Sequence, residues 1–508
     1  MDAAAQREVI AFLADPASHG GAAVERIDTH ISTLFLVGDR AFKLKKAVRL
    51  PFLDYTDPAE RRRCCHAELE RNRPNAPGLY LGVAAITRAA DGRLEFEGAG
   101  PALDWVVVMR RFAEETRFDH LATAGRLDND LLDGLTDAVV ACHAAAAPRP
   151  DQGGVVPLAA VIDSNHATLM AAAPAILDPA AIAALTAASR SALDRLAPRL
   201  ERRRAEGRVR ACHGDLHLGN LCLFEGRPTL FDAIEFRDDY IAIDPFYDLA
   251  FLLMDLSQRG LAAAASRVMN RYLDRTGDYD GAPALPLFLA LRATIRAHVT
   301  ATIALAAPAE QREALAAAAR GYLAAAAAAL APPPPRLVAI GGLSGSGKSR
   351  LGRDLAPLLG VPGAVVVRSD ALRKQLLGAA PEQRLGPEAY NPAMSQRTYH
   401  ALGETCAALL AAGCPVIADA VFARPDERAA IEAVAEAAGV PFAGLWLEVA
   451  PELAARRIRE RRPELSDATP AVLEHQLGYD LGPLAWSRID SGQDKPATLA
   501  AARALLGL

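Results

Sequence analysis

This chain of 508 residues has few aromatic residues, no paired-cysteine motif and only a small net charge. Its seven cysteines form no C-x-x-C pair and show no metal-ligand spacing, so no cysteine-based metal site is expected. Their odd number indicates reduced thiols and a cytoplasmic location. A net charge of −5 and a pI of about 6.2 give no overall basic field, which argues against nucleic acid or an anionic membrane as partner.

Long apolar runs are absent as well. No apolar stretch of about 18 residues is both free of charge and rich enough in large side chains to span a bilayer. The first residues, Met1–Glu8, lack a basic region followed by an apolar core, so we expect no secretion signal. Alanine accounts for much of the 51% hydrophobic content and acts mostly as a helix former.

The chain changes character at Pro332–Pro335, where an Ala-rich predicted helix runs into four consecutive prolines. Prolines cannot continue a helix, and such a run forms a semi-rigid spacer. We therefore predict a first domain over residues 1–330, a linker over 331–335 and a second domain over 336–508.

The two predicted domains differ in fold class. Strands alternate with helices in the second, which predicts an α/β fold with a parallel sheet. The first begins with strands and becomes mostly helical after Asp119, as in an α+β fold. The predicted strands cover residues 24–27, 33–37, 41–44, 337–340, 364–367, 415–418 and 442–447.

The segment Gly342–Ser349 matches the pattern G-x-x-x-x-G-K-[ST] at every fixed position. It lies between a predicted buried strand and a predicted helix over 349–359, where a helix N-terminus faces an anion. A Gly/Ser-rich turn without a ligand is the alternative, which the flanking elements disfavour. We predict that backbone N–H groups here wrap the phosphates of ATP, that Lys348 reaches them and that Ser349 holds Mg²⁺. The predicted contacts are Gly342, Gly345, Ser346, Gly347, Lys348 and Ser349.

Charged residues follow two other strands of the second domain. Asp370 comes just after strand 364–367, with Arg373 three residues on, which suits a base and a clamp for a hydroxylated acceptor. A helix-capping aspartate is the alternative for Asp370. Asp419 ends strand 415–418, where we predict an acid that orders Mg²⁺.

Five arginines fall within the seven residues of 456–462. On a helix they cannot all face one way. We predict that Arg456 and Arg459 fold over the triphosphate as a lid and stabilise the charge that develops during transfer. A nucleic-acid patch or a solvated face is the alternative, although no interleaved aromatic residues support strand binding.

A second set of chemical groups lies upstream. Asp215 and Asn220 stand at the D-x-x-x-x-N spacing of a kinase catalytic loop, and Asp232 follows 17 residues after Asp215. In a kinase-like site the first Asp takes the proton of the acceptor hydroxyl, while the Asn and the later Asp hold metal ions. His213 and His217 leave a metal site or a structural turn as alternatives.

Strand 41–44 continues into a lysine pair on one face, so Lys43 and Lys45 are both candidates for the phosphate-binding lysine. A helix predicted from Asp57 onward places Glu68 on a face with weakly polar neighbours, where a carboxylate needs a cation. We pair Glu68 with Lys43, and a solvated Glu68 is the alternative. The strand around Met109 is predicted to lead into a hinge whose backbone binds adenine, although a plain core strand fits equally well.

The run His213–Asn220, followed by Asp232 and by Asp248-Leu-Ala, resembles the aminoglycoside phosphotransferase-like kinases over about residues 20–325. The resemblance implies that Asp215 is the catalytic base, that Asn220 and Asp232 hold Mg²⁺, and that Asp248 supports the site or anchors a helix. One departure is that no G-x-G-x-x-G precedes Lys43. Asp28–Thr33 takes that place with polar side chains.

The second domain resembles gluconate and shikimate kinases, and more closely a bacterial class of predicted AAA-type kinases, over about residues 335–505. Tyr390–Pro392, Asp419–Phe422 and Ser466–Ala468 are marks of that class. The whole chain is similar to a bacterial bifunctional fusion of these two kinase domains.

Three hypotheses follow. The first is a kinase with two sites, each using ATP and Mg²⁺ to phosphorylate a hydroxyl of a small metabolite such as a sugar, sugar acid or amino alcohol. The second makes one domain a nucleotide-binding regulator of the other. The third gives the P-loop domain a polynucleotide or nucleotide-sugar acceptor, although the acidic pI and the few aromatics speak against nucleic acid. The expected partners are thus small molecules, with neither nucleic acid nor membrane.

Overall fold

The computed structural model describes residues 3–50, 53–460 and 465–508. It divides into two compact units, one of Met1–Pro157 with Ala197–Asp248 and one of Leu158–Leu196 with Leu249–Leu508. The predicted linker falls inside the second unit, where residues 332–335 form neither helix nor strand between α11 (Ala309–Ala329) and β13 (Leu337–Gly341). The predicted domain boundary there stays a prediction.

A six-stranded antiparallel sheet forms the start of the first unit, and its first three strands lie where the sequence predicts them. Helix α1 (Ala3–Ala14) packs Val9 and Leu13 on one face of the sheet. Helix α2 (Pro58–Asn72), capped by Asp57, packs Cys65 on the other face. In sheet order the strands are β1 (Val24–Asp28), β2 (Ser32–Val37), β3 (Arg40–Lys45), β8 (Ala102–Arg110), β6 (Tyr80–Arg88) and β7 (Leu94–Phe96).

The rest of the first unit holds short elements that carry the predicted catalytic residues. Asp215 and Asn220 lie between β9 (Arg210–Ala211) and β10 (Leu221–Phe224), and Asp232 follows β11 (Arg227–Leu230). Strands β10 and β11 form an antiparallel hairpin. At its open end the N–H of Phe231, the residue before Asp232, donates to the Asn220 carbonyl at 3.1 Å. The surrounding elements are β4 (Arg49–Leu50), β5 (Leu53–Asp54), α3 (Phe118–Thr123), α4 (Asn129–Ala145), α7 (Asp238–Ile241), β12 (Ala242–Ile243) and the start of α8 (Pro245–Gln258).

Long helices open the second unit: most of α5 (Val155–Ala172) and α6 (Pro179–Ala205), then α9 (Ala262–Thr276), α10 (Leu285–Ala306) and α11. Among the described residues, Val155–Ala172 and Tyr279–Ala306 are long and apolar enough to cross a bilayer by length and composition alone. Core helices of soluble proteins meet the same criterion. Both stretches contain charged residues, such as Asp163 and Arg292.

A five-stranded parallel sheet follows, in the order β14 (Val365–Arg368), β15 (Val416–Asp419), β13, β16 (Phe442–Glu448), β17 (Ser487–Asp490). The four predicted strands are confirmed. No strand was predicted at β17, a short segment in which only Ile489 is buried. All five carboxyl ends meet at one edge, where the phosphate loop begins.

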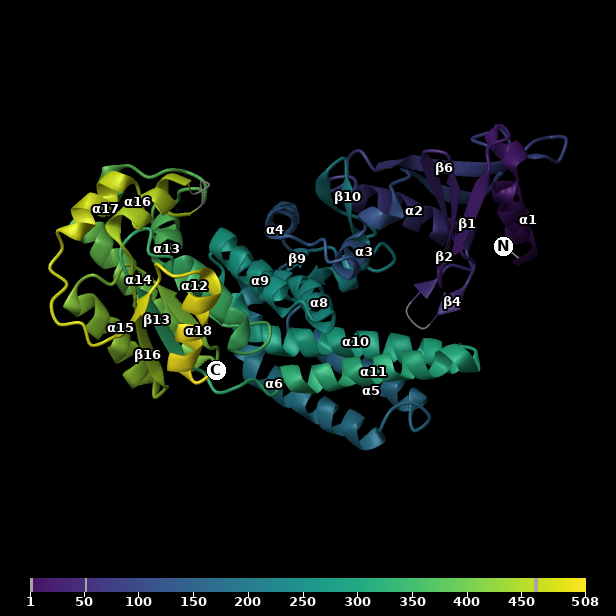
Figure 1. Ribbon diagram of the computed structural model, residues 1–508. Coiled ribbons are helices and arrows are strands. Elements are labelled where there is room, and N and C mark those ends of the chain that lie inside the picture. Colours follow the sequence, from purple (N-terminus) through teal and green to yellow (C-terminus); the bar gives the residue numbers. More distant parts are fainter. Residues whose placement is uncertain (1–2, 51–52, 461–464) are drawn as a thin grey trace. The chain divides into compact units, whose positions relative to one another are not determined.

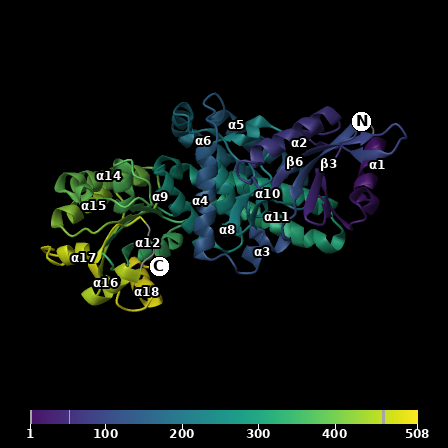
Figure 2. The same ribbon diagram turned by 90° about the horizontal axis from the view of Figure 1, so that it is seen from above.

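Helices cover both faces of this sheet (Figure 1 and Figure 2). On one face α12 (Lys348–Leu355) and α18 (Lys495–Leu506) bury Leu351 and Leu506 in the core. The predicted helix over 349–359 ends earlier, at Leu355, and continues as a 3₁₀ turn because Pro357 lacks an N–H. The other face carries α14 (Pro392–Ala411) and α15 (Pro425–Ala438). The remaining helices are α13 (Ser369–Leu376), α16 (Pro451–Glu460) and α17 (Pro470–Leu477).

The packing of Gly444 against Trp486 gives a test of this core. A Cβ added at Gly444 would lie 2.4 Å from the indole, whose Nε1 is held by Glu432 at 2.6 Å. We expect Gly444→Ala to lower the free energy of unfolding by about 1–3 kcal/mol through overpacking. Gly403→Ala in α14 is the control, because its Cβ would meet Val434 at an ordinary 3.7 Å. Urea unfolding followed by tryptophan fluorescence measures both, and equal stability of the two variants would contradict the packing.

Candidate functional site

Five charged side chains form what we call the buried charge cluster: Lys43, Lys45, Glu68, Asp232 and Glu235. Lys43 Nζ donates to Glu68 Oε1 at 2.9 Å, and Lys45 Nζ donates to Glu68 Oε2 at 2.8 Å. Lys43 also pairs with Asp232, and Lys45 with Glu235. The predicted Lys43–Glu68 pair is therefore present, and a second lysine shares the same carboxylate. The cluster joins β3, α2 and the segment after β11.

Mutual pairing controls protonation in this cluster. Burial would lower the pKa of Lys43, but the carboxylates of Asp232 and Glu68 outweigh it and raise that pKa. Burial would raise the pKa of Glu68, but the two lysines outweigh it and lower that pKa. For Asp232 the loss of hydration is the largest influence and raises the pKa, although Lys43 opposes the shift and the side chain stays partly exposed. Three carboxylates face two ammonium groups, so the cluster has room for added positive charge.

The two lysines differ in what they can reach. The Lys43 side chain is 10% exposed and contacts Asp232, whose side chain is 39% exposed. Lys45 is fully buried and lies 5.5 Å from the centre of the Tyr55 ring. The Tyr55 hydroxyl donates to Glu235 at 2.7 Å. This geometry favours Lys43 as the phosphate-binding lysine and Lys45 as a structural one. No motif in the sequence marks Tyr55 or Glu235.

The structure brings Asp215 and Asn220 together. Asn220 Nδ2 donates to Asp215 Oδ2 at 2.9 Å and to the Asp215 carbonyl at 3.0 Å, while His217 Nε2 lies 3.4 Å from Asp215 Oδ2. Asp232 has a φ of 63°, in the left-handed region that non-glycine residues rarely adopt. Its N–H donates to the Tyr80 hydroxyl at 3.0 Å. Backbone strain of this kind gathers at functional sites.

Asp248, in the first turn of α8, holds the backbone of the predicted catalytic segment, His213–Asn220. Its fully buried carboxylate accepts the N–H groups of His213 at 2.9 Å and Gly214 at 3.0 Å, and His143 Nε2 lies 3.1 Å away. His143, Cys212 and Asp248 have the proximity of metal ligands. These hydrogen bonds already occupy the Asp248 oxygens, which makes it the anchor that the resemblance implies.

His213 does not join a metal site with His217. Its Nε2 lies 2.9 Å from the Phe231 carbonyl, and burial lowers the pKa of its imidazole, so the neutral ring donates this hydrogen bond. The ring thereby ties the catalytic segment to the residue preceding Asp232.

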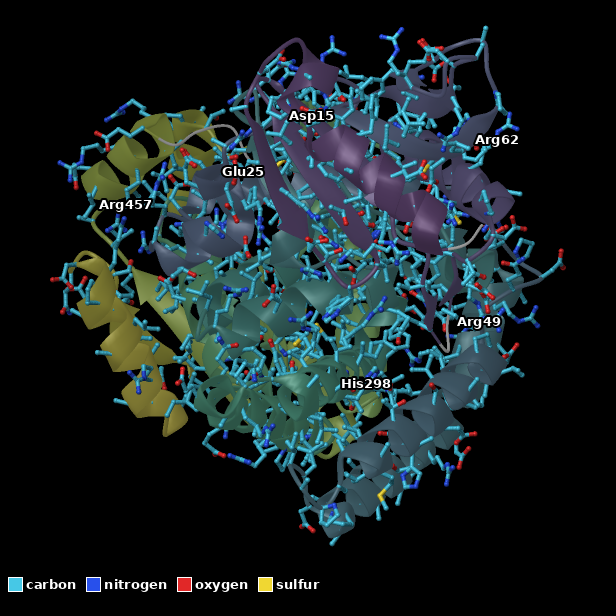
Figure 3. All side chains as sticks on the ribbon, turned by 90° about the vertical axis from the view of Figure 1, so that its right-hand side faces the viewer. Asp15, Glu25, Arg49, Arg62, His298 and Arg457 are labelled. Carbon is cyan, nitrogen blue, oxygen red and sulfur yellow. The ribbon has the colours of Figure 1, made fainter. Side chains whose placement is uncertain are left out.

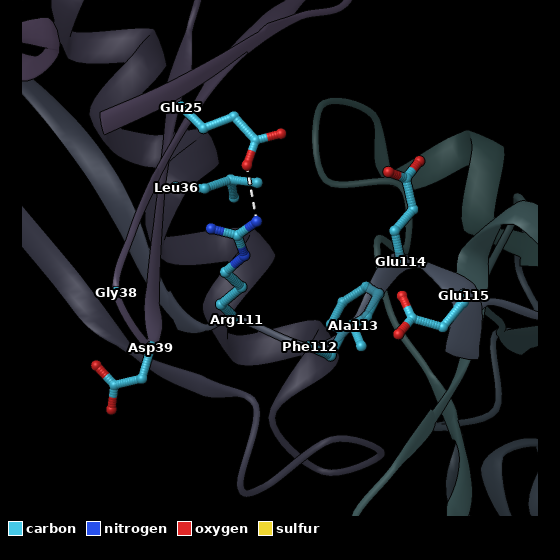
Figure 4. Close-up of a pocket in the computed structure, with 9 residues that line it drawn as sticks. All are labelled: Glu25, Leu36, Gly38, Asp39, Arg111, Phe112, Ala113, Glu114 and Glu115. Atoms are coloured by element: carbon cyan, nitrogen blue, oxygen red, sulfur yellow. Dashed lines mark hydrogen bonds and ion pairs between the residues drawn. The ribbon is translucent and has the colours of Figure 1, made fainter. Parts of the chain in front are cut away.

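Met109 is buried near the end of β8, where its backbone is paired between Ala41 of β3 and Tyr80 of β6. The predicted hinge follows it. There Arg111–Glu115 line a cavity of about 510 Å³ together with Glu25, Leu36, Gly38 and Asp39 (Figure 4). Glu25 and Arg111 form an ion pair at 2.7 Å within it. The role of this segment as an adenine-binding hinge stays a prediction.

The turn between β1 and β2 lies where kinases have a glycine-rich loop. Some of its backbone N–H groups form hydrogen bonds within the turn itself. The N–H of Thr29 donates to the Ser32 carbonyl at 2.8 Å, and the N–H of Ser32 donates to Thr29 Oγ1 at 3.0 Å. Thr33 Oγ1 donates to Asp28 at 2.8 Å. Those donors are thus engaged within the turn.

The phosphate loop of the second unit depends on glycine. Gly342, Gly345 and Gly347 have φ values of 138°, 80° and 97°. A Cβ at Gly345 would lie 2.6 Å from the Ala454 carbonyl of α16. Lys348 Nζ donates to the Leu343 carbonyl at 3.0 Å. Ser346 is buried in the loop and Ser349 is partly exposed in the first turn of α12.

A side chain that no motif marks supports this loop. Gln476 of α17 accepts the N–H of Ser344 at 2.8 Å and is itself buried.

The predicted acids lie at the carboxyl edge of the parallel sheet. Asp419 ends β15 and is buried, with its Oδ2 3.5 Å from Arg368 Nε. Asp370 is the second residue of α13, inside the helix rather than at its cap. Arg373, one turn later, donates to the Ala389 carbonyl at 2.9 Å and stacks on the Tyr390 ring at 4.7 Å.

Arg456 and Arg459 are exposed on α16, on the face opposite Ala454 and Ile458, which are buried. Arg457, labelled in Figure 3, instead donates to the Ser491 carbonyl at 2.8 Å. Their predicted role as a lid stays a prediction. Arg461 and Arg462 lie outside the described residues.

Two segments of the chain match known protein families. Residues 35–285 match the family model of a phosphotransferase enzyme family, and residues 337–479 match that of an AAA domain. The chain therefore carries a segment of phosphotransferase type followed by a segment of AAA type. It is 29% identical over 466 residues to an uncharacterized protein of Mycobacterium tuberculosis strain H37Rv, covering 90% of each chain. The predicted fold classes are confirmed.

Solved structures that match parts of this chain include the following two. A choline/ethanolamine kinase family protein of Mesorhizobium loti is 18% identical with a TM-score of 0.40, covering 65% of this chain and 96% of its own. A gluconokinase of Sinorhizobium meliloti is 24% identical with a TM-score of 0.25, covering 34% of this chain and 92% of its own.

The different surroundings of the two lysines give a test. Lys43→Ala leaves Glu68 paired with Lys45, so we expect a folded protein whose first site binds ATP roughly 10- to 100-fold more weakly, as for loss of a charged hydrogen bond. Lys45→Ala leaves Glu235 without its cation, so we expect a loss of about 3–5 kcal/mol in unfolding free energy. Calorimetric ATP titration in a Lys348→Ala background and thermal unfolding measure the two effects. If Lys45→Ala instead weakened ATP binding and Lys43→Ala lowered the stability, Lys45 would be the phosphate ligand.

Proposed function

We propose that the chain is an ATP-dependent kinase with two phosphoryl-transfer sites, each acting on a hydroxyl of a small metabolite such as a sugar, sugar acid or amino alcohol. One observation supports the proposal most: Lys43 pairs with Asp232 and Asn220 with Asp215 in the first unit, while in the second Asp370 and Asp419 lie at or just after the carboxyl ends of strands in the sheet that carries the phosphate loop. Both domain matches belong to kinase-type families, which supports phosphoryl transfer with ATP.

In the first unit, the residues suit ATP and Mg²⁺. The amide oxygen of Asn220 and the carboxylate of Asp232 are ligands that Mg²⁺ prefers, and the buried charge cluster has an excess of carboxylates. The metal, when bound, neutralises phosphate charge. Lys43 binds the phosphates. Asp215 takes the proton of the acceptor hydroxyl while the hydroxyl oxygen attacks the γ-phosphorus and ADP leaves. The hydrogen bonds from Asn220 fix the Asp215 carboxylate for that task.

In the second unit, Lys348 and the loop N–H groups hold the phosphates, while Ser349 and Asp419 suit Mg²⁺. Asp370 serves as the base, and Arg373 orients the acceptor through its fixed guanidinium. Arg456 and Arg459 are exposed on α16 and are the residues that would supply positive charge over the triphosphate.

The β1–β2 turn supports a second candidate for the first unit. Because the N–H groups of Thr29 and Ser32 are engaged within the turn, fewer backbone donors face the phosphates than in a glycine-rich loop. In that case the first unit binds ATP without transferring phosphate and regulates the P-loop site.

A coupled ADP-release screen over sugars, sugar acids, amino alcohols and aminoglycosides tests the proposal on wild type, Asp215→Asn and Lys348→Ala. We expect each productive acceptor to lose activity in one variant only, by about 10²- to 10⁴-fold for the loss of a general base at Asp215. Asp194→Asn, the same change at an exposed site on α6, is the control.

The outcomes of this screen are distinct. ATP bound at both sites, with every acceptor lost in Lys348→Ala alone, favours the regulatory candidate. Turnover unaffected by both active-site variants would reject the proposal.

A further inference from the structure

Helix α9 covers the free edge of the parallel sheet. Strand β14 is an edge strand, whose outward backbone groups need partners. Asn270 of α9 supplies them: its Nδ2 donates to the Ala364 carbonyl at 3.1 Å, and its Oδ1 accepts the N–H of Val366 at 2.7 Å. The side-chain amide of Asn270 thus pairs with β14 as a neighbouring strand would. Helix and strand belong to the same compact unit.

The contact continues along both elements. Ser266, Asn270 and Asp274 are spaced four residues apart, which places them on one face of α9. A Cβ at Gly363 would lie 2.5 Å from Ser266 Oγ, so only glycine allows this approach. At the other end, Arg368 donates to Asp274 Oδ2 at 3.1 Å. Figure 1 and Figure 2 show α9 beside the helices that cover the parallel sheet.

Arg368 connects this contact to the P-loop site. Its guanidinium lies between two carboxylates, Asp274 on α9 and Asp419 at the end of β15, 3.5 Å from Arg368 Nε. All three side chains are largely buried, with 12%, 7% and 4% of Asp274, Arg368 and Asp419 exposed. A buried guanidinium of this kind pairs with both acids, and the removal of one acid leaves the other as its remaining partner here.

We propose that Asp274 is a positioning residue of the P-loop site, which acts on Asp419 through Arg368. Without Asp274, Arg368 would pair with Asp419 alone and compete with Mg²⁺ for that carboxylate. The inference rests on the proposed role of Asp419 in ordering Mg²⁺. It also means that the P-loop site includes a residue from the segment that matches the phosphotransferase family, which lies before the linker in the sequence.

ATP titration of the full chain, with Mg²⁺ and with EDTA, tests the inference without requiring an acceptor. The Lys348→Ala variant identifies the binding that belongs to the P-loop. We expect Asp274→Asn to reduce the gain in ATP affinity due to Mg²⁺ by roughly 10- to 100-fold, as for other residues that orient metal ligands. Affinity in EDTA should stay within about threefold. Asp194→Asn is the matched control and should leave both values unchanged.

Two further variants separate positioning from folding. Asp274→Glu keeps the charge on a longer side chain and should give an intermediate loss, and it replaces Asp274→Asn as the test variant if that protein does not fold. Asn270→Ala should speed hydrogen exchange at the Val366 amide, which reports the edge contact independently of any activity.

The inference is overturned if folded Asp274→Asn, or Asp274→Glu in its place, shows the Mg²⁺ dependence of the wild type. It is likewise overturned if Asn270→Ala leaves exchange at Val366 unchanged. Failure of the proposed function looks different: ATP binds with the Mg²⁺ dependence described, Asp274→Asn weakens it, and no acceptor is phosphorylated.

Discussion

The carboxylate of Glu68 is the interaction on which the first unit depends. A buried carboxylate is costly unless it is paired, and here it accepts from two ammonium groups at once. Each lysine then carries a second acid, Asp232 or Glu235, from the segment after β11. The sheet, helix α2 and the segment after β11 are therefore held in one arrangement by charge. A shift of any one of them would leave a charge unpaired in the interior.

Backbone hydrogen bonds hold the predicted catalytic segment of the first unit and the phosphate loop of the second. In the first, Asp248 accepts two consecutive N–H groups of the catalytic segment. In the second, Gln476 accepts the N–H of Ser344 in the phosphate loop. Neither side chain needs to touch a substrate. Each supporting side chain comes from a helix, which is a more rigid support than the loop it holds.

Residues marked by a motif or by helical periodicity were predictable from sequence, and residues that contribute only through packing were not. The phosphate loop and the Asp215–Asn220 segment have fixed spacing, and the inward face of α2 follows from helical periodicity, which gave the Lys43–Glu68 pair. Gln476 lies 132 residues from Ser344, and its role arises only from packing. Strand β17 escaped prediction because its residues are mostly exposed, so it lacks the apolar signal of a central strand.

The contact between α9 and β14 changes how the two domains are to be understood. The family matches end at 285 and begin again at 337, and the prolines between them suggest two independent modules. Yet the edge strand of a sheet must be paired or covered, and here Asn270 does so from within the first match. Through Asp274 and Arg368 the same helix reaches the acid at the end of β15. A helix from the segment that matches the phosphotransferase family thus covers the edge of the parallel sheet.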